Sequence, residues 1–183
     1  MAASLLVSGA SLWRLKTRQG TYKIAALCLW LGAYACLANA AILSPFIEPE
    51  LATLGINLAL YVGVPMAALV MLDVALGWHW QRATWGRIFL GLAAMFELMR
   101  RAEAGNTYAE FMLMACILAL LFAVFKILKL VKLKGQSIAK PGLILSLYLA
   151  FMVASLGSLN SGFALLWNAA TLLTFGGYLY LSA

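Results

Sequence analysis

One stretch, FMLMACILALLFAVFKILKLVKLK at residues 111–134, constrains the fold more than any other. Residues 111–125 carry no charge, and the same apolar background is then interrupted by Lys126, Lys129, Lys132 and Lys134. A helix rises about 1.5 Å per residue, so roughly 20 residues cross a hydrocarbon core of about 30 Å. The lysines therefore lie at or just beyond one interface, with their ammonium groups among the headgroups. Because basic residues mark the cytoplasmic side of a membrane, this end of the segment is expected to face the cytoplasm.

The composition indicates a protein that is built for lipid. Of 183 residues, 65% are hydrophobic and only 10% are charged, whereas soluble domains are about 45–50% apolar and about 25% charged. The net charge of +7 comes from residues at the ends of apolar runs, which is where the positive-inside rule places them, so nucleic-acid binding is not expected. We expect a multi-pass protein of the cell membrane, of the kind found in bacterial inner membranes, with the lipid bilayer as its first partner.

The apolar runs predict an all-α, polytopic transmembrane helix bundle of about six spans. Their expected bounds are 24–44, 51–76, 88–99, 111–134, 141–156 and 163–181. The predicted cytoplasmic connections carry four, two and five Lys or Arg, and the outer ones carry none, two and none. Both termini are therefore expected in the cytoplasm. Five or seven spans remain alternatives, and Pro65 predicts a kink within the second span.

The chain is expected to divide into an N-terminal part, residues 1–23, and a single transmembrane domain, residues 24–183. Residues 1–13 are apolar but too short to span, and their positive charges follow the apolar stretch, so a cleavable signal is not predicted. We expect a short interfacial helix on the cytoplasmic surface, with Leu5, Leu6 and Trp13 in the headgroup boundary. A re-entrant half-helix is the alternative.

Ionisable groups inside lipid are the candidate functional residues. Asp73 and Lys126 are both expected about one turn from the cytoplasmic ends of their spans, where they could pair across a helix interface. That pair is either a structural salt bridge or part of an ion or proton path. Glu97 precedes Arg100 and Arg101 by one helical turn, which predicts an ion pair at a helix end.

Four asparagines are predicted near the outer ends of their spans, and with Glu97 and Arg100 they could form an outer polar vestibule. The alternative is that these amides hold helices together. They are Asn39, Asn57, Asn160 and Asn168.

Other residues are expected to anchor the protein or to pack its helices. The predicted interface anchors are Trp13, Trp78, Trp80, Trp85, Lys129 and Lys132. The small residues Gly32, Cys36 and Ala40 recur at intervals of four, which favours packing of the first span against another helix, and Gly176 and Gly177 permit the same in the last span. The three cysteines lack metal-site spacing and His79 is the only histidine, so we expect no metal site and no cofactor.

No catalytic motif is found, and we expect a protein that is not an enzyme. The first hypothesis is a non-enzymatic component of a membrane complex or a self-associating homo-oligomer. The second is a channel or small-solute transporter that uses Asp73 and Lys126 together with the vestibule around Glu97, Arg100, Asn57 and Asn168. The third is an interfacial lipid-acting enzyme, for which His79, Glu97 and Arg100 are the only reagents and are expected on opposite sides of the membrane.

Overall fold

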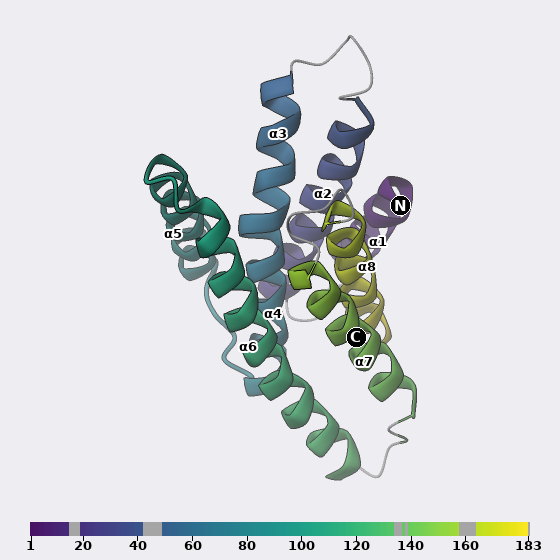
Figure 1. Ribbon diagram of the computed structural model, residues 1–183. Coiled ribbons are helices and arrows are strands. Elements are labelled where there is room, and N and C mark those ends of the chain that lie inside the picture. The colour runs from purple at the N-terminus through teal and green to yellow at the C-terminus, as the bar shows by residue number, and fades with distance from the viewer. Residues whose placement is uncertain (15–18, 42–48, 134–136, 138, 158–163, 183) are drawn as a thin grey trace.

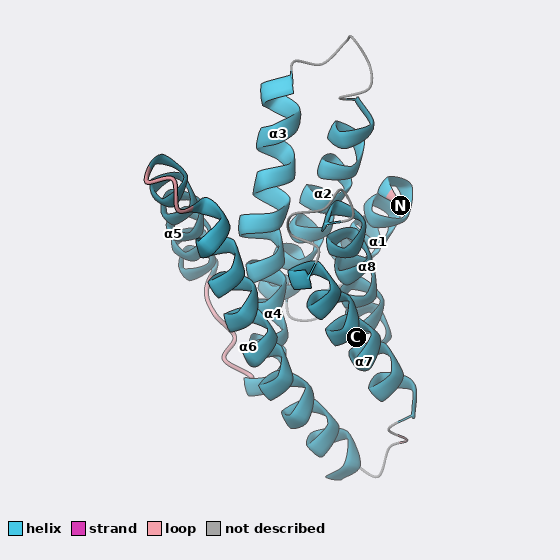
Figure 2. Cartoon of the chain, viewed as in Figure 1, coloured by secondary structure: helices cyan, strands magenta, loops and turns pink. Residues whose placement is uncertain are grey.

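The structure is a computed structural model that describes residues 1–14, 19–41, 49–133, 137, 139–157 and 164–182. Over these ranges the chain is all-helical, and Figure 2 shows helices joined by loops without a strand. The elements are α1 (Ala2–Arg14), α2 (Gln19–Ala41), α3 (Pro49–Leu58), the π-helical turn η1 (Ala59–Gly63), α4 (Val64–Leu76), α5 (Arg82–Arg101), α6 (Gly105–Leu133), α7 (Ala139–Gly157) and α8 (Ala164–Ser182). The all-α prediction is confirmed.

The centre of the bundle is formed by α2 and α4. α2 packs against α1, α3, α4 and α8, and α4 also packs against α6. Figure 1 shows α5 on one side of this centre and α7 and α8 on the other, with α6 crossing in front of α4 from α5 toward α7. Burial follows the same arrangement, because 72% of the most apolar part of Ile56–Leu76 lies inside the protein but only 33% of that of Gly105–Leu133. α6 is therefore a peripheral helix.

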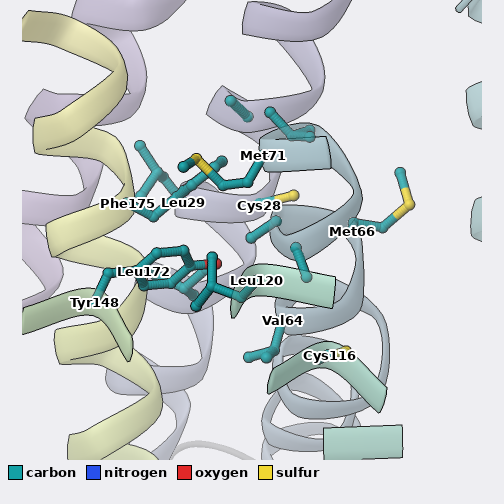
Figure 3. Close-up of a cluster of buried hydrophobic side chains, with 14 of the residues drawn as sticks. Cys28, Leu29, Val64, Met66, Met71, Cys116, Leu120, Tyr148, Leu172 and Phe175 are labelled. Carbon is teal, nitrogen blue, oxygen red and sulfur yellow. The ribbon is translucent and has the colours of Figure 1, made fainter. Parts of the chain in front are cut away.

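Side chains from five helices meet in the core (Figure 3). Tyr148 of α7 and Phe175 of α8 are fully buried, with ring centroids 5.9 Å apart. Leu120 of α6 and Leu29 of α2 belong to the same cluster and are also fully buried. The core therefore draws on both the N-terminal and the C-terminal halves of the chain.

The close approach of α2 and α8 depends on two glycines. A Cβ added at Gly32 would stand 2.6 Å from Leu172 Cδ1, and one added at Gly176 would stand 2.9 Å from Leu29 Cδ1. Each helix thus places a leucine over a glycine of the other. This confirms the prediction that the first span packs against a helix, and it confirms the role predicted for Gly176.

α1 packs along α2 and α8 and is not separated from the bundle. Leu5 lies against Gly32 and the ammonium of Lys23 lies over the Trp13 ring, so α1 runs antiparallel to α2. Leu5 and Leu12 are fully buried. The prediction that Leu5 lies in the headgroup boundary is therefore wrong, because its side chain contacts protein.

A wide helical turn lies just before Pro65, the residue at which a kink is predicted. Proline has no N–H to donate within a helix, so the preceding turn must adjust. The chain does so in η1, where the Val64 N–H bonds to the carbonyl of Ala59, five residues earlier. α3, η1 and α4 follow one another without a break, and single π turns inside α-helices are the usual form that π-helix takes.

Three helical segments among the described residues are long and apolar enough to cross a membrane. They are Gly20–Ala38, Ile56–Leu76 and Gly105–Leu133. They match the first, second and fourth predicted spans, and they indicate a membrane-associated protein. α5 extends well beyond the predicted 88–99, and its charged residues, Arg82, Arg87, Glu97, Arg100 and Arg101, exclude it from this group.

Candidate functional site

The carboxyl group of Asp73 is the most deeply buried ionisable site among the predicted functional residues. Asp73 is 0% exposed in the last turns of α4. The hydroxyl of Thr21, in the first turns of α2, donates to Asp73 Oδ2 over 2.6 Å. The backbone N–H of Trp80 donates to Asp73 Oδ1 over a longer 3.4 Å. Asp73 therefore ties α4 both to α2 and to the segment that follows α4.

That segment is a tight turn with two residues in left-handed backbone conformations. Gly77 caps α4 with φ 67°, and its N–H donates to the backbone carbonyl of Asp73 over 2.8 Å. His79 also has a positive φ, 53°. These conformations reverse the chain within a few residues, so that the Trp80 N–H reaches back to Asp73.

Three tryptophans of this region lie in contact, two of them stacked and the third tilted against the pair. The Trp78 and Trp80 rings are 4.9 Å apart and nearly parallel, and the Trp85 ring lies 5.1 Å from that of Trp80. Trp78 is half exposed, as an interface anchor would be, but Trp85 is fully buried and its ring packs within the protein. Trp13 remains 42% exposed beside Trp30.

Lys126 does not meet Asp73 in the arrangement shown by the described residues. Its side chain is exposed on α6, and its ammonium lies 5.7 Å from the centroid of the Phe122 ring. The partners shown for the Asp73 carboxyl are Thr21 and Trp80. Lys129 and Lys132 are exposed farther along α6.

Glu97 forms an ion-pair fork within its own helix. Arg100 donates to both carboxylate oxygens over 2.8 Å, and Arg101 donates to Oε1 over 2.9 Å. These hydrogen bonds, first that from Arg100 and then that from Arg101, lower the pKa of Glu97 from 4.5 to about 2. The same pair raises the pKa of Arg100. The fork confirms the predicted one-turn pairing and leaves these charges on the surface of α5.

The predicted outer vestibule is not assembled around this fork by any contact that the described residues show. Asn57 lies half-buried on α3, and Asn168 is buried on α8. The side chain of Asn39 and the whole of Asn160 lie outside the described residues. The contacts shown for the fork are therefore those within α5.

A cavity of about 470 Å³ lies between α2, α4 and α5. Its lining is almost entirely apolar, and Arg82, the first residue of α5, is its one charged member. The main contacts of α5 are with α6 and η1, and residues of its first half, from Arg82 to Leu90, line this space. The volume falls within the range of about 300–1,000 Å³ that small-molecule sites occupy.

Sequence reasoning missed Thr21 and the cavity. Thr21 is 52 positions from Asp73, and nothing in either local sequence links the two. The cavity depends on how far α5 leans from its neighbours, which no pattern of residues encodes. The one local signal is Arg82 itself, a charge at the start of α5.

Comparison of the chain with protein-family models, with curated proteins and with solved structures found no match.

Proposed function

We propose that α5, α7 and α8 cross the membrane together with the three apolar segments, which gives six spans with the C-terminus in the cytoplasm. α5 has 20 residues and α7 and α8 have 19 each, so each reaches about 30 Å at about 1.5 Å per residue. In this topology Arg82 lies at the inner surface, and the fork of Glu97 with its arginines lies in the outer headgroup region. α1 is antiparallel to α2 and packed against it, so Arg14 lies near the inner surface and the N-terminal end of α1 lies deeper in the bundle.

Within this topology the chain acts as a non-enzymatic, self-associating membrane protein or a subunit of a membrane complex, and it associates through the outer face of α6. The observation that carries this proposal is a row of large exposed side chains at seven-residue spacing. Phe111, Leu118 and Phe125 are 65%, 68% and 65% exposed, and Met114 and Leu121, also seven apart, are 44% and 45% exposed. We call these five residues the α6 seam.

The spacing of the seam supports helix packing in addition to lipid contact. A repeat of seven with alternating gaps of three and four keeps one stripe facing a partner helix along its whole length. In a bilayer such association rests on close side-chain packing, since lipid tails are as apolar as leucine. The exposed share of α6 is also the largest of the three apolar segments, so α6 has the most surface available for contact with a partner helix.

Native mass spectrometry of the protein extracted gently from its own membranes tests this proposal, because it reports copy number and co-purifying chains together. We expect a fixed oligomer or a fixed ratio to another protein, lost in the double variant Leu118→Ala, Phe125→Ala. The matched control is Leu143→Ala, Leu147→Ala, on exposed leucines of α7, which should keep the assembly. A monomer without partners, or equal loss in both double variants, contradicts the proposal.

The second candidate is a channel or small-solute transporter, and the buried Asp73 is the observation that favours it. Lys126 is exposed, so this candidate rests on the carboxyl of Asp73 and the hydroxyl of Thr21. If Asp73 belongs to a conduction path, Asp73→Asn alters flux in reconstituted vesicles while the folded yield is unchanged. Unaltered flux removes this role.

An interfacial lipid-acting enzyme has less support. Its reagents would be His79, which precedes α5, and Glu97 with Arg100 at the far end of α5. The helix from Arg82 to Glu97 alone rises about 22 Å, at about 1.5 Å per residue. Groups this far apart cannot act on one reacting bond.

A further inference from the structure

We propose that the cavity between α2, α4 and α5 binds an acyl chain of an anionic phospholipid, and that Arg82 binds the phosphate of its headgroup. Three observations carry this inference: the apolar walls of the cavity, its opening at exposed apolar residues, and two hydrogen-bond donors without an accompanying acidic group.

The walls suit a hydrocarbon chain. Leu31 of α2, Met66 of α4 and Phe89 of α5 line the cavity, which has a volume of about 470 Å³. Figure 3 shows the Met66 side chain pointing away from the core rings of Tyr148 and Phe175, so it is available to this space on the other side of α4. Apolar walls cannot replace the hydrogen bonds that a polar solute makes with water, whereas a hydrocarbon chain makes no such bonds and loses none on entering.

The cavity opens toward the surroundings of the bundle at Leu27 and Leu90, which line it and are 44% and 68% exposed. In a membrane protein, exposed leucines in the middle of helices face lipid. A ligand would therefore enter sideways from the bilayer, which favours a lipid over a water-soluble molecule.

The polar groups at the cavity are donors. Arg82 is exposed and lines the cavity, and a guanidinium binds phosphate oxygens through two parallel hydrogen bonds. Trp85 also lines the cavity, and its buried indole N–H has no acceptor among the described residues. A buried donor of this kind is uncommon, and an ester or phosphate oxygen of a lipid would supply its acceptor. Anionic lipids are also concentrated in the cytoplasmic leaflet, where we place Arg82.

Two glycines of α5 provide a matched pair of variants. Gly86 lines the cavity, Gly91 does not, and a Cβ at either position would meet nothing within 4 Å. A leucine at either position also improves helix propensity, so neither variant is expected to harm the fold. Gly86→Leu places a side chain in the cavity, and Gly91→Leu adds the same apolar bulk one and a half turns away.

The test measures binding of dioleoyl phosphatidylglycerol to the full-length protein in detergent, by native mass spectrometry and by the shift in the thermal midpoint. We expect wild type and Gly91→Leu to bind it alike, and Gly86→Leu to bind at least about tenfold more weakly. Dioleoyl phosphatidylcholine should bind wild type more weakly than phosphatidylglycerol does, and glycerol phosphate, which has the anion without the chains, should not compete.

Arg82→Gln and Arg87→Gln test the headgroup contact, since both arginines are exposed on α5 but only Arg82 lines the cavity. A hydrogen bond to a charged group corresponds to roughly tenfold in affinity or more, so Arg82→Gln should remove the preference for phosphatidylglycerol and Arg87→Gln should keep it. Any one of three results overturns the inference. They are equal binding by the two glycine variants, equal loss of the lipid preference in the two arginine variants, and competition by glycerol phosphate. If Gly86→Leu fails to fold, the arginine pair and the lipid comparison still decide.

Discussion

Thr21 and Asp73 form a hydrogen bond of 2.6 Å between the two central helices, with 3% and 0% of their surfaces exposed. The hydroxyl of Thr21 joins the first turns of α2 to the last turns of α4. Replacing it by a methyl group in Thr21→Val keeps the shape of the side chain but leaves a buried carboxyl oxygen without this donor. We expect the free energy of unfolding to fall by about 1–3 kcal/mol, as measured by titration with dodecyl sulfate from mild detergent micelles.

Two further variants separate the hydrogen bond from the packing around it. Thr21→Ser keeps the hydroxyl and should recover most of the loss. Thr107→Val makes the same change at an exposed threonine of α6 and should be nearly neutral. If Thr21→Val is as stable as wild type, the bond contributes nothing measurable.

The contact of α2 with α8 predicts opposite effects for two glycine-to-alanine changes. In Gly32→Ala the new Cβ would meet Leu172 Cδ1 at 2.6 Å, so the buried Leu172 side chain must move within the core. We expect a loss of about 1–3 kcal/mol in stability from overpacking. In Gly177→Ala the Cβ meets nothing within 4 Å, and better helix propensity should add up to about 1 kcal/mol. Thermal midpoints that move in the same direction for both variants would contradict this account.

The fork at Glu97 predicts a pH dependence at the end of α5. The hydrogen bonds from Arg100 and Arg101 lower the pKa of Glu97 to about 2 in the folded protein, from 4.5. Because the folded pKa is the lower one, the ion pairs contribute fully above about pH 4.5, and this contribution is lost as the pH falls toward 2. As the pH falls over this range, the free energy of unfolding should therefore decrease more in wild type than in Glu97→Gln. Glu110→Gln, at an exposed glutamate of α6, should follow wild type, and parallel curves for wild type and Glu97→Gln would refute the prediction.

Features that depend on local sequence were predicted well. The apolar run before Lys126 became a helix through Leu133, and the one-turn spacing of Glu97 to Arg100 became an ion pair. Pro65 was expected to distort its helix, and the π turn lies just before it. In each case the cause and the effect lie within a few residues of one another, so the sequence alone contains the information.

Features that depend on tertiary packing were not predicted. Leu5 was assigned to the headgroups because its segment is short, but hydropathy cannot distinguish a lipid surface from the surface of another helix. For the same reason Trp85, expected at the interface, is buried. The sequence predicts a charged partner for Asp73, Lys126, whereas the structure supplies the neutral hydroxyl of Thr21. Apolar patterning shows that a helix face is kept from water. Only the packed bundle shows whether lipid or another helix covers that face.

The turn after α4 predicts a difference between two substitutions at one position. Gly77 has φ 67° and ψ 34°, and a Cβ there would meet nothing within 4 Å, so the cost of a side chain is conformational and not steric. Gly77→Ala should lower the free energy of unfolding by about 1–2 kcal/mol, the usual cost of a left-handed conformation. Gly77→Asn should cost less, because asparagine adopts this conformation more readily. The Trp80 N–H reaches Asp73 only if the turn is held, so the fluorescence of the Trp78–Trp80 stack should change more in Gly77→Ala. Equal stability of the two variants would mean that the turn does not require the left-handed conformation.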